Sequence, residues 1–367
     1  MSIDEIHMSR ALALAERGRG RTTPNPIVGA VVVDAGGVVV GRGAHLVAGG
    51  PHAEVHALTE AGERARDGTL YCTLEPCTHF GRTGPCAPKV IEAGIRRAVI
   101  AMHDPNPVVA GKGIARLREH GLDVTVGVGA RAAERLNPGF VTRMRLGRPF
   151  VTMKAALTLD GCVALAPGVR SLLTGPAANR LVHRERAEVD ALVVGSGTIL
   201  TDDPLLTPRG PFRYRPLVRV VLDRRLRTSP DARLLSTASA GPVIIMSTQS
   251  SAQSVPERVS ALAGKGARLE LLDGDGPPGS FLSQSLQRLA GLDCSSVVVE
   301  GGPTLHDAFW RARLVDRVQL FVTPQVAGQQ GVRWDVLPIG TLGALADATV
   351  RVWGDDVQIE GHVHRID

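Results

Sequence analysis

The sequence predicts an α/β protein built from two domains. Its 367 residues, of which 44% are hydrophobic and 21% are charged, exceed the roughly 100–200 residues typical of one domain. In both halves, short apolar stretches typical of strands alternate with helical stretches, a pattern that predicts layered α/β domains. An arginine- and glycine-rich stretch at residues 137–149 separates the halves. We therefore expect a first domain over residues 1–145 and a second over residues 146–367.

The elements of the first domain follow in a regular order. We expect helices at residues 4–17, 53–65, 85–93 and 112–119, with strands at 27–33, 38–44, 69–73, 98–102 and 123–126. The second domain opens with a strand at residues 150–157, followed by a helix near 177–187. Further strands are expected at residues 191–194, 218–222, 243–246, 297–299 and 318–322, with two polar strands near the C-terminus. Proline, glycine and serine clusters at residues 207–216 and 273–280 predict surface loops.

Composition narrows the classes of function. The net charge of +6 suits an anionic partner, but aromatic residues make up only 3% of the chain, too few for the stacking platforms of single-stranded nucleic-acid binders. A small phosphorylated ligand fits better. No apolar run approaches the roughly 18 residues of a membrane span, and the charged start is not typical of a secretory signal, so we expect a cytoplasmic protein. Five cysteines argue against a disulfide framework.

The strongest functional signal lies in two segments, PHAEVHA at residues 51–57 and TLEPCTHFGRTGPC at residues 73–86. They supply one imidazole and two thiols, those of His52, Cys77 and Cys86. Three such ligands leave the fourth tetrahedral position open for water, as is typical of catalytic zinc. Both cysteines lie near a predicted helix start, where free N–H groups favour the thiolate. We therefore predict a catalytic zinc site on these three residues.

Glu54 lies two residues after His52 and is free for proton transfer. Its carboxylate can take a proton from the attacking water and deliver it to a leaving amine, as in the H-x-E and P-C-x-x-C signature of zinc deaminases. The alternative is that His52 caps a helix while Cys77 and Cys86 are inert core residues, since free cysteines are commonly buried. We expect Cys72, in an apolar strand, to be such a core residue.

The spacing of the two cysteines departs from the common signature. Eight residues separate Cys77 from Cys86, whereas the signature has two. The insert THFGRTGP contains His79 and Arg82. We expect both side chains to overhang the zinc site, where they can contact a phosphate group or the edge of a pyrimidine.

Together with TPNPIVGA at residues 23–30 and HDPNPVVAGKG at residues 103–113, these motifs resemble the deaminase half of the bifunctional riboflavin-biosynthesis enzymes, which acts on diaminohydroxyphosphoribosylaminopyrimidine. The resemblance covers residues 4–145. It implies a cytidine-deaminase-like fold of three layers. The asparagines and the aspartate of these motifs are otherwise ordinary turn residues. The residues that the resemblance places around the substrate are Asn25, His45, His79, Arg82, Asp104 and Asn106.

Three segments carry the functional signal of the second half: MKAALTLDG at residues 153–161, GSGTILTDDPLLTPR at 195–209 and VVVEGGPTLHDA at 297–308. The last reads as a strand, paired glycines and a helix, an arrangement that lets backbone N–H groups approach a phosphate. Alone, such a glycine pair is more often a tight turn. Together, the segments resemble the reductase half of the same enzymes, a domain similar in fold to dihydrofolate reductase and dependent on NADPH.

The reductase resemblance assigns two groups of residues. It implies NADPH contacts from Thr198, Asp202, Gly302, Pro303 and Thr304. It implies substrate contacts from Arg186, Leu206, Arg209 and Glu300, where the arginines suit a phosphate because the guanidinium fork binds it bidentately. We also expect Lys154, one of only four lysines among 42 basic residues, to contact the substrate ring as a catalytic residue. The alternative to this role is that Lys154 is an ordinary strand residue whose ammonium group reaches water.

The two resemblances predict a bifunctional enzyme of riboflavin synthesis with Zn²⁺ and NADPH as cofactors. Its N-terminal domain would hydrolytically deaminate 2,5-diamino-6-ribosylamino-4(3H)-pyrimidinone 5′-phosphate. Its C-terminal domain would then reduce the ribosyl side chain to ribityl. We expect a small phosphorylated pyrimidine as substrate, no nucleic-acid or membrane partner, and a homo-oligomer.

Departures from the family pattern keep an alternative open. Where the family has Ser, any residue and then Trp-Ile-Thr, this chain has Arg170, Ser171, Leu172, Leu173 and Thr174, and Arg224 replaces a small polar residue. These positions border substrate and NADPH in the family. The alternative is therefore a deaminase whose degenerate second domain serves oligomerisation. A nucleic-acid deaminase with an accessory domain is a further alternative, suggested by the positive charge.

Overall fold

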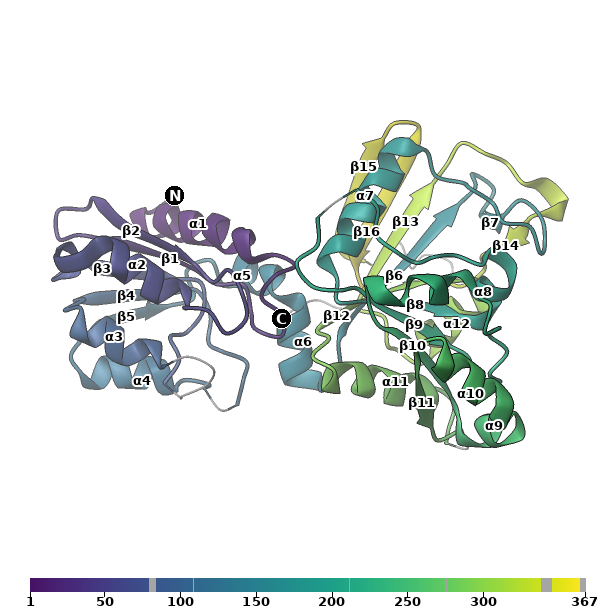
Figure 1. Ribbon diagram of the computed structural model, residues 1–367. Coiled ribbons are helices and arrows are strands. Elements are labelled where there is room, and N and C mark those ends of the chain that lie inside the picture. The colour runs from purple at the N-terminus through teal and green to yellow at the C-terminus, as the bar shows by residue number, and fades with distance from the viewer. Residues whose placement is uncertain (79–83, 108, 211, 275, 338–344, 364–367) are drawn as a thin grey trace. The chain divides into compact units, whose positions relative to one another are not determined.

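The computed structural model describes residues 1–78, 84–107, 109–210, 212–274, 276–337 and 345–363. The chain divides into two compact units, of which the first spans Met1–Arg148 and the second begins at Pro149. Each unit has its own sheet and its own hydrophobic core (Figure 1). In the described part of the chain, no helix is both long and apolar enough to span a membrane.

The first unit contains a five-stranded sheet with the order β2-β1-β3-β4-β5. Its first strand pairs antiparallel with both neighbours, while β3, β4 and β5 are parallel. The strands are β1 (Gly29–Val33), β2 (Val39–Ala44), β3 (Thr69–Cys72), β4 (Arg97–Ile100) and β5 (Asp123–Val126). The helices are α1 (Ile3–Ala15), α2 (Ala53–Ala61), α3 (Cys86–Glu92), α4 (Lys112–Glu119), α5 (Ala130–Leu136) and α6 (Pro138–Leu146).

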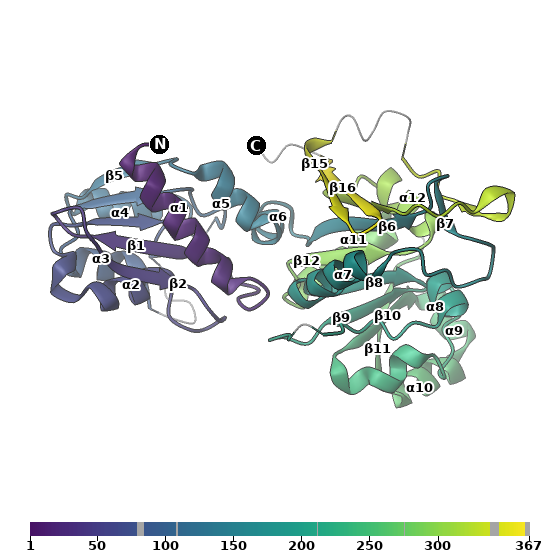
Figure 2. The same ribbon diagram turned by 90° about the horizontal axis from the view of Figure 1, so that it is seen from above.

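Glycines bring helices close to both faces of this sheet. A Cβ on Gly29 would lie 1.9 Å from the carbonyl oxygen of Ala11 in α1. On β2, a Cβ on Gly43 would lie 1.9 Å from Ala53 O, and one on Gly41 would lie 2.0 Å from Ala57 O, both in α2. Since Gly29 and Gly43 occupy adjacent register positions, with Gly29 opposite Ala44, the two helices cover opposite faces. Figure 2 shows these layers, and the predicted three-layer arrangement is confirmed.

A helix occupies much of the stretch that the sequence suggested as a simple join. α6 begins with Pro138 at its first position, and Gly147 ends it with φ 66°. Proline at the start and glycine past the end are common helix boundaries. Just before it, the buried side chain of Asn137 accepts a hydrogen bond from Ile27 N (2.8 Å) and donates one to Ile27 O (2.9 Å). This pair of bonds fixes the segment that leads into β1.

The second unit contains a nine-stranded sheet with the order β11-β10-β9-β8-β12-β6-β13-β16-β15. It is parallel from β11 to β13 and ends in two antiparallel strands. Its strands are β6 (Phe150–Leu157), β8 (Ala191–Gly195), β9 (Val218–Leu222), β10 (Val243–Thr248), β11 (Ala267–Leu272), β12 (Ser296–Glu300), β13 (Arg317–Val322), β15 (Ala346–Trp353) and β16 (Asp356–His362), with β7 (Cys162–Ala164) paired to β14 (Val332–Arg333) outside it. The helices are α7 (Pro176–Glu188), α8 (Ser196–Asp202), α9 (Gln249–Ser254), α10 (Pro256–Gly264), α11 (Ser280–Gly291) and α12 (Pro303–Arg311).

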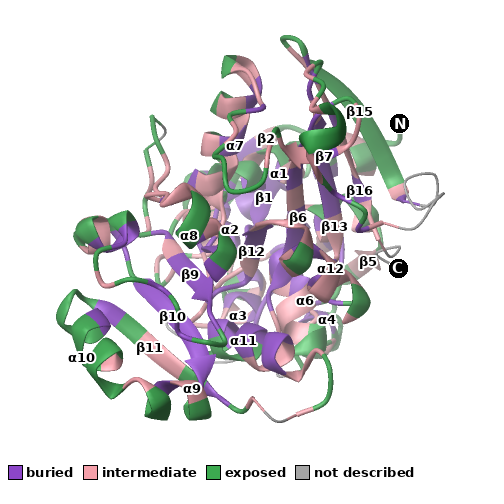
Figure 3. Ribbon diagram, turned by 90° about the vertical axis from the view of Figure 1, so that its right-hand side faces the viewer, coloured by how far each residue is buried: buried purple, intermediate pink, exposed green. Residues whose placement is uncertain are grey.

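The inner strands of this sheet are apolar on both faces, as is expected for parallel strands covered by helices. Val193 belongs to one core cluster, while its chain neighbours Leu192 and Val194 belong to another. Figure 3 shows the buried central strands and the exposed edge strand β15. β15 and β16 are the two polar strands expected near the C-terminus. The helices α8 and α12 start directly after β8 and β12, so their first turns lie at the carboxyl edge of the sheet.

Candidate functional sites

The predicted zinc ligands meet in the first unit. His52 is the N-cap residue of α2, Cys86 is the first residue of α3, and Cys77 follows β3 in a loop. The His52 Nδ1 atom lies 3.2 Å from Cys86 Sγ and 3.6 Å from Cys77 Sγ. All three ligand atoms lie within 4.8 Å of one another. Cys77 is held near the helix start because its carbonyl oxygen accepts hydrogen bonds from Cys86 N (3.0 Å) and Ala87 N (3.1 Å).

This donor set fits zinc. Around a tetrahedral zinc with metal–ligand bonds of about 2.0–2.3 Å, neighbouring nitrogen and sulfur ligands lie roughly 3.5–3.8 Å apart, close to the observed separations. Hydrogen bonding to Cys86 and to His52 outweighs burial and lowers the pKa of the Cys77 thiol to about 4. The site therefore already stabilises one of the two thiolates that the metal requires.

Glu54 lies beside the ligands in the first turn of α2, with only 3% of its surface exposed. Burial raises the pKa of its carboxyl group, and the nearby imidazole of His52 opposes that rise. A buried carboxyl whose pKa is raised toward neutrality can both accept and return a proton. The side chain is thus chemically suited to a proton shuttle next to the ligand set.

His45 and Asn25 form a fixed pair next to His52. The Nδ1 atom of His45 lies 3.1 Å from the carbonyl oxygen of Pro51 and donates to it, so Nε2 accepts from Asn25 Nδ2 at 3.2 Å. Burial lowers the pKa of His45, which favours this neutral tautomer. The His45 and His52 rings pack edge to face with centroids 5.2 Å apart. His45 therefore lies against the predicted zinc ligand His52, and Asn25 is hydrogen-bonded to His45 on its other side.

Glu75 is a structural determinant of this site that the sequence analysis did not identify. Its buried carboxylate accepts backbone hydrogen bonds from Gly113 (2.8 Å), Gly111 (2.9 Å), Ile114 (3.1 Å) and Asp104 (3.2 Å). These bonds tie the first turn of α4 and the segment before it to the loop that carries Cys77. In the sequence, the only sign of this role is that Glu75 is an acidic residue between Leu74 and Pro76. Its hydrogen-bond partners lie 29 to 39 residues further along the chain, so no local pattern links them to it.

The same bonds hold the predicted substrate residues Asp104 and Asn106 near the zinc loop. Asn106 N donates to Asp104 Oδ1 at 2.8 Å, which makes the DPNP segment a compact turn. His79 and Arg82 lie outside the described residues. Cys72 is fully buried in the core, as expected.

In the second unit, the predicted residues line one cavity of about 1620 Å³. The cavity borders the carboxyl ends of β9, β8 and β12 and the adjacent part of β6. Ligands bind at this edge in open α/β sheets. The predicted cofactor and substrate residues that line it are Lys154, Arg186, Thr198, Asp202, Leu206, Arg209, Glu300, Gly302, Pro303 and Thr304.

Lys154 lies in register with Glu300 on one neighbouring strand and with Gln319 on the other. Burial lowers the pKa of Lys154, and the charge of Glu300 opposes that effect. Glu300 accepts two hydrogen bonds from Arg186, one of them 3.0 Å from Nε. Desolvation disfavours the Glu300 carboxylate, but the charges of Arg186 and Lys154 outweigh it and lower the pKa of Glu300 to about 2. The three groups form a partly buried, charged floor of the cavity.

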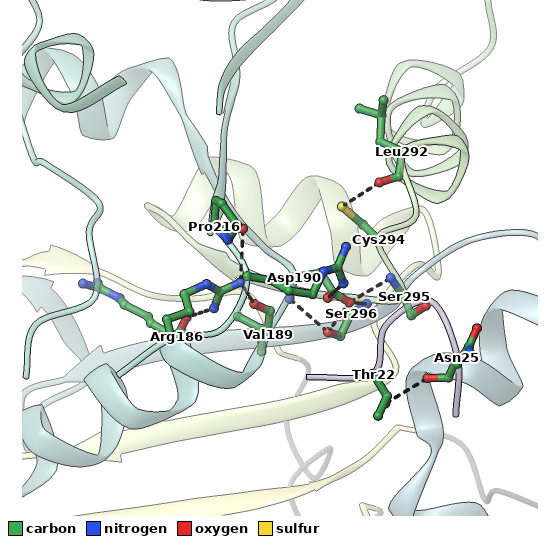
Figure 4. Close-up of polar contacts among 12 residues, drawn as sticks. Thr22, Asn25, Arg186, Val189, Asp190, Pro216, Leu292, Cys294, Ser295 and Ser296 are labelled. Atoms are coloured by element: carbon green, nitrogen blue, oxygen red, sulfur yellow. Dashed lines mark hydrogen bonds and ion pairs between the residues drawn. The ribbon is translucent and has the colours of Figure 1, made fainter. Parts of the chain in front are cut away.

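The segment bearing Arg209 is tied to the end of α7 by Arg213, another residue that the sequence analysis did not identify. Arg213 Nη1 donates to Arg186 O and Nη2 to Val189 O, both at 2.6 Å, and Figure 4 shows these two acceptors. Burial lowers the pKa of Arg213 to about 10, so it stays cationic at neutral pH. Arginine at a helix C-terminus satisfies carbonyl groups that lack helical partners. The contacts therefore fix the backbone of Arg186.

A buried histidine lies behind the paired glycines of the cavity. His306, in the first half of α12, is 0% exposed. Its Nδ1 accepts a hydrogen bond from Trp334 Nε1 at 2.9 Å, and its ring also hydrogen-bonds to the backbone of Val299. Burial lowers the pKa of His306 to about 4, so the ring is neutral at physiological pH.

The family departures Arg170, Leu172 and Arg224 also line this cavity. Leu172 is 77% exposed at its border, and Arg170 lies in the same loop. Burial raises the pKa of Asp202, and the charge of Arg170 opposes that rise. The substituted loop thus brings a guanidinium group close to one of the predicted cofactor residues.

The folds and sites define a zinc-dependent deaminase joined to a nicotinamide-dependent reductase. Residues 1–102 match the cytidine and deoxycytidylate deaminase zinc-binding region, and residues 149–359 match the RibD C-terminal domain. The chain belongs to the RibD family of riboflavin biosynthesis proteins. Like its relatives, it is a bifunctional deaminase and reductase, with zinc and NADPH as cofactors.

Similar proteins cover nearly the whole chain. The riboflavin biosynthesis protein RibD of Escherichia coli strain K12 is 41% identical, over 94% of each chain. That of Aquifex aeolicus is 40% identical, over 93% of this chain and 91% of the relative. The structure of Acinetobacter baumannii RibD, form 1, superposes with a TM-score of 0.84 at 34% identity, covering 98% of both chains. A Thermotoga maritima structure described as a diaminohydroxyphosphoribosylaminopyrimidine deaminase/5-amino-6-(5-phosphoribosylamino)uracil reductase gives 0.83 at 34% identity, again over 98% of both.

Proposed function

We propose that residues 1–145 deaminate 2,5-diamino-6-ribosylamino-4(3H)-pyrimidinone 5′-phosphate and that residues 146–367 reduce the ribosyl group of the product to ribityl. The observation that carries the proposal is the cluster of His52, Cys77 and Cys86 with the buried Glu54 beside it. The description of the Thermotoga maritima relative supports the substrate. The second cavity supplies the site for the reduction.

In the deaminase step, His52, Cys77 and Cys86 would hold zinc, which supplies Lewis-acid activation of the attacking water. Glu54 accepts a proton from that water and donates it to the departing amine, so the proton stays in the site. Asn25, whose amide nitrogen is fixed by His45, orients the pyrimidine. We propose Asp104, Asn106, His79 and Arg82 as its further substrate contacts.

In the reductase step, bound NADPH would supply the hydride that reduces the ribosyl group to ribityl. The backbone N–H groups of Gly302 and Thr304 at the start of α12 would bind the cofactor pyrophosphate, with Pro303 between them as a non-donating contact. Thr198 and Asp202 would contact the same molecule. Lys154 binds the substrate ring from the cavity floor. Arg209 pairs with the substrate phosphate, for which its guanidinium fork is suited. Leu206, Arg186 and Glu300 complete the contacts.

The test assays the two half-reactions separately on the purified full chain. Ammonia release from the diaminopyrimidine substrate without NADPH measures the first step. Loss of NADPH absorbance with the deaminated ribosylaminouracil phosphate measures the second. Activity in both assays is expected. Ammonia release without any NADPH consumption would contradict the reductase assignment and favour a second unit that serves oligomerisation.

We further propose that the enzyme works as a cytoplasmic homo-oligomer on a free small molecule and not on nucleic acid. The scarcity of aromatic residues supports the last point. RNA binding measured over a range of salt concentrations tests the last point. Tight binding at low salt that weakens steeply as salt is added would contradict it, because protein contacts to phosphates release counterions. Sedimentation at several protein concentrations measures the oligomeric state.

A further inference from the structure

A row of polar side chains crosses one face of the second sheet. Glu300 on β12, Lys154 on β6, Gln319 on β13 and Glu360 on β16 occupy matching positions on four adjacent strands. Residues paired across neighbouring strands point to the same face of a sheet. The proposed function uses Glu300 and Lys154, which line the cavity. It gives no role to Gln319, although this polar side chain is 0% exposed in the middle of the row.

The helix α7 packs on this face of the sheet (Figure 1), where its Ala178 and Val182 form a buried cluster with Phe321 of β13. Toward its C-terminal end, α7 places an acid over the polar row. The Oε1 atom of Glu185 accepts a hydrogen bond from Gln319 Nε2 at 2.6 Å. Burial raises the pKa of Glu185, and the hydrogen bond from Gln319 opposes that rise. The two side chains thus form a polar pair on the strand next to Lys154.

The contacts of Gln319 fix the direction of its amide group. Besides contacting Glu185, its Nε2 atom lies 3.4 Å from Oε2 of Glu360 on β16. An ionised carboxylate only accepts hydrogen bonds, so this network assigns the NH2 end of the amide to the side of the two acids. The amide oxygen, Oε1, is buried and has no hydrogen-bond partner among the described residues. Because β16 and β6 flank β13 on opposite sides, an amide with its NH2 end toward β16 presents this oxygen toward β6.

Lys154 supplies the complementary donor on β6. Within the described part of the chain, its ammonium group has no hydrogen-bond partner. Its Nζ atom lies 5.5 Å from the centre of the Phe321 ring, which is two residues from Gln319 along β13 and therefore on the same face. Neighbouring strands are about 4.8 Å apart, so a rotation of the flexible lysine chain brings Nζ to Gln319 Oε1. Pairing would satisfy both groups, since a buried polar atom without a partner costs free energy.

The charges around Lys154 make such a contact matter. The titratable groups that act on it or respond to its charge are Glu300 of β12, His306 of α12, and His183, Glu185 and Arg186 of α7. Burial has the largest effect and lowers the pKa of Lys154, the two carboxylates raise it, and the guanidinium group lowers it. Burial also lowers the pKa of both histidines, which favours their neutral forms. A hydrogen bond accepted from the charged form of the lysine would raise its pKa.

We propose that Gln319 is a positioning residue of the reductase site, whose Oε1 atom accepts a hydrogen bond from the ammonium group of Lys154. Glu185 and Glu360 hold the amide in the orientation that this bond needs. The bond uses one of three ammonium donors, so two remain for Glu300 and the substrate. It keeps Lys154 protonated in surroundings whose burial favours the neutral amine. The inference rests on the proposed function, because it requires Lys154 to contact the substrate.

The test measures the pKa of Lys154 by NMR on the full chain, a readout that needs no turnover. The chain has only four lysines, so 13C labelling of the lysine Cε atoms gives four signals, and Lys154→Arg identifies the one that belongs to Lys154. The chemical shift of this signal is followed as the pH is raised. In Gln319→Met, which keeps the length of the side chain but lacks the amide, the pKa of Lys154 should fall by about one pH unit, the scale of one hydrogen bond to a charged group.

A second variant guards against loss of the fold. Gln319→Met leaves Glu185 without its hydrogen-bond donor, whereas the double variant Gln319→Met/Glu185→Leu removes the acid as well and leaves an apolar pair. In the double variant, the pKa of Lys154 should fall by at least as much as in the single variant. Glu188→Leu is the matched control, because it makes the same exchange three residues further along α7. It should leave the pKa of Lys154 at the wild-type value.

Kinetics connect this pKa to the reaction. In both Gln319 variants, the alkaline limb of the kcat/KM profile of the reductase should move to lower pH, while the deaminase keeps its wild-type profile. An unchanged pKa of Lys154 in both variants, with or without a loss of stability, would overturn the inference and leave the proposed function intact. A lowered pKa with an unchanged reductase profile would overturn the role of Lys154 in the reaction, and with it the positioning role of Gln319. Failure of wild type to consume NADPH would overturn the proposed reductase function itself, whatever the pKa values.

Discussion

The carboxylate of Glu75 accepts a hydrogen bond from the backbone N–H of Gly113 at 2.8 Å, across 38 residues of sequence. Gly113 approaches so closely that a Cβ there would lie 2.0 Å from the carbonyl oxygen of Pro76. Because Cys77 directly follows Pro76, this contact joins the zinc loop to the segment that carries Asp104 and Asn106. One buried carboxylate thus organises both parts of the deaminase site.

Glu75→Gln should lower deaminase activity while the chain retains zinc. An amide in place of the carboxylate would face several N–H groups with its own donors, and we expect destabilisation of about 2–3 kcal/mol. Three measurements check this prediction: the zinc content, the rate of ammonia release, and the calorimetric unfolding temperature of the first unit. Wild-type activity with an unchanged transition would show that the four backbone bonds do not organise the site.

Cys86→Ser should lose both zinc and deaminase activity, because two remaining ligands do not hold the tetrahedral geometry. Wild type should contain about one zinc per chain. Metal analysis of the purified proteins gives the answer. Cys294→Ser is the control, since Cys294 is a buried cysteine of the second core, and it should retain zinc. Full zinc occupancy in Cys86→Ser would remove this residue from the ligand set.

Glu54→Gln should keep zinc and lose deaminase activity by at least about 100-fold, the usual effect of removing a general acid–base group. The amide has the size of the carboxyl group but does not shuttle a proton. Parallel metal analysis and ammonia release separate the two effects. Near-normal turnover would assign the proton transfer to another group, and loss of zinc would make Glu54 a ligand or a determinant of the fold.

Lys154→Ala and Arg209→Ala should each slow the reductase by at least about tenfold, because each removes a charged contact from the substrate. Arg209→Ala should act mainly through the KM of the phosphorylated substrate. Deaminase activity of the same preparations is the internal control and should stay at the wild-type level. Unchanged NADPH consumption in both variants would exclude these side chains from the site.

His306 should make the second unit less stable in mild acid. Its pKa is about 4 when folded, against an ordinary value of 6.5. Between these values the unfolded chain binds more protons than the folded one, so stability falls as pH is lowered. From pH 7 to pH 5, the loss from this group is about 2 kcal/mol.

His306→Asn should remove about that part of the pH dependence, while retaining an acceptor for Trp334. The three tryptophans, Trp310, Trp334 and Trp353, all follow Pro149 in the sequence, so denaturant unfolding followed by tryptophan fluorescence reports on the second unit within the full chain. His120→Asn in the first unit is the control. Equal pH dependence in wild type and His306→Asn would show that the buried imidazole does not resist protonation.

Local patterns predicted the order of the main elements and which three side chains would lie together as candidate zinc ligands. His52, Cys77 and Cys86 follow from residue chemistry and spacing, and the structure brings their ligand atoms together. Of the two cysteines expected near a helix start, Cys86 is the first residue of α3, whereas Cys77 lies in the loop before it. The register of Lys154 with Glu300 on adjacent parallel strands was not predicted, because it depends on the order of strands in the sheet.

The residues that the sequence did not reveal act over long distances along the chain. Glu75 binds backbone groups up to 39 residues away, Asn137 binds Ile27 across 110 residues, and Arg213 caps a helix that ended 25 residues earlier, at Glu188. Backbone N–H and C=O groups are the same at nearly every residue, so the sequence does not show which of them a distant side chain will bind. Such contacts emerge only once the sheet order is known.

The close packing of α2 on β2 constrains how the deaminase unit can vary. Gly41 and Gly43 are two strand residues apart, roughly 6.6 Å, and contact carbonyls four helix residues apart, roughly 6 Å. A methyl group at either position would push away the helix that carries His52 and Glu54. Random mutagenesis with selection for ammonia release should therefore reject most changes at both glycines and accept many at the exposed Arg42 between them, so lineages that keep the activity would diverge at residue 42 and retain glycine on either side of it.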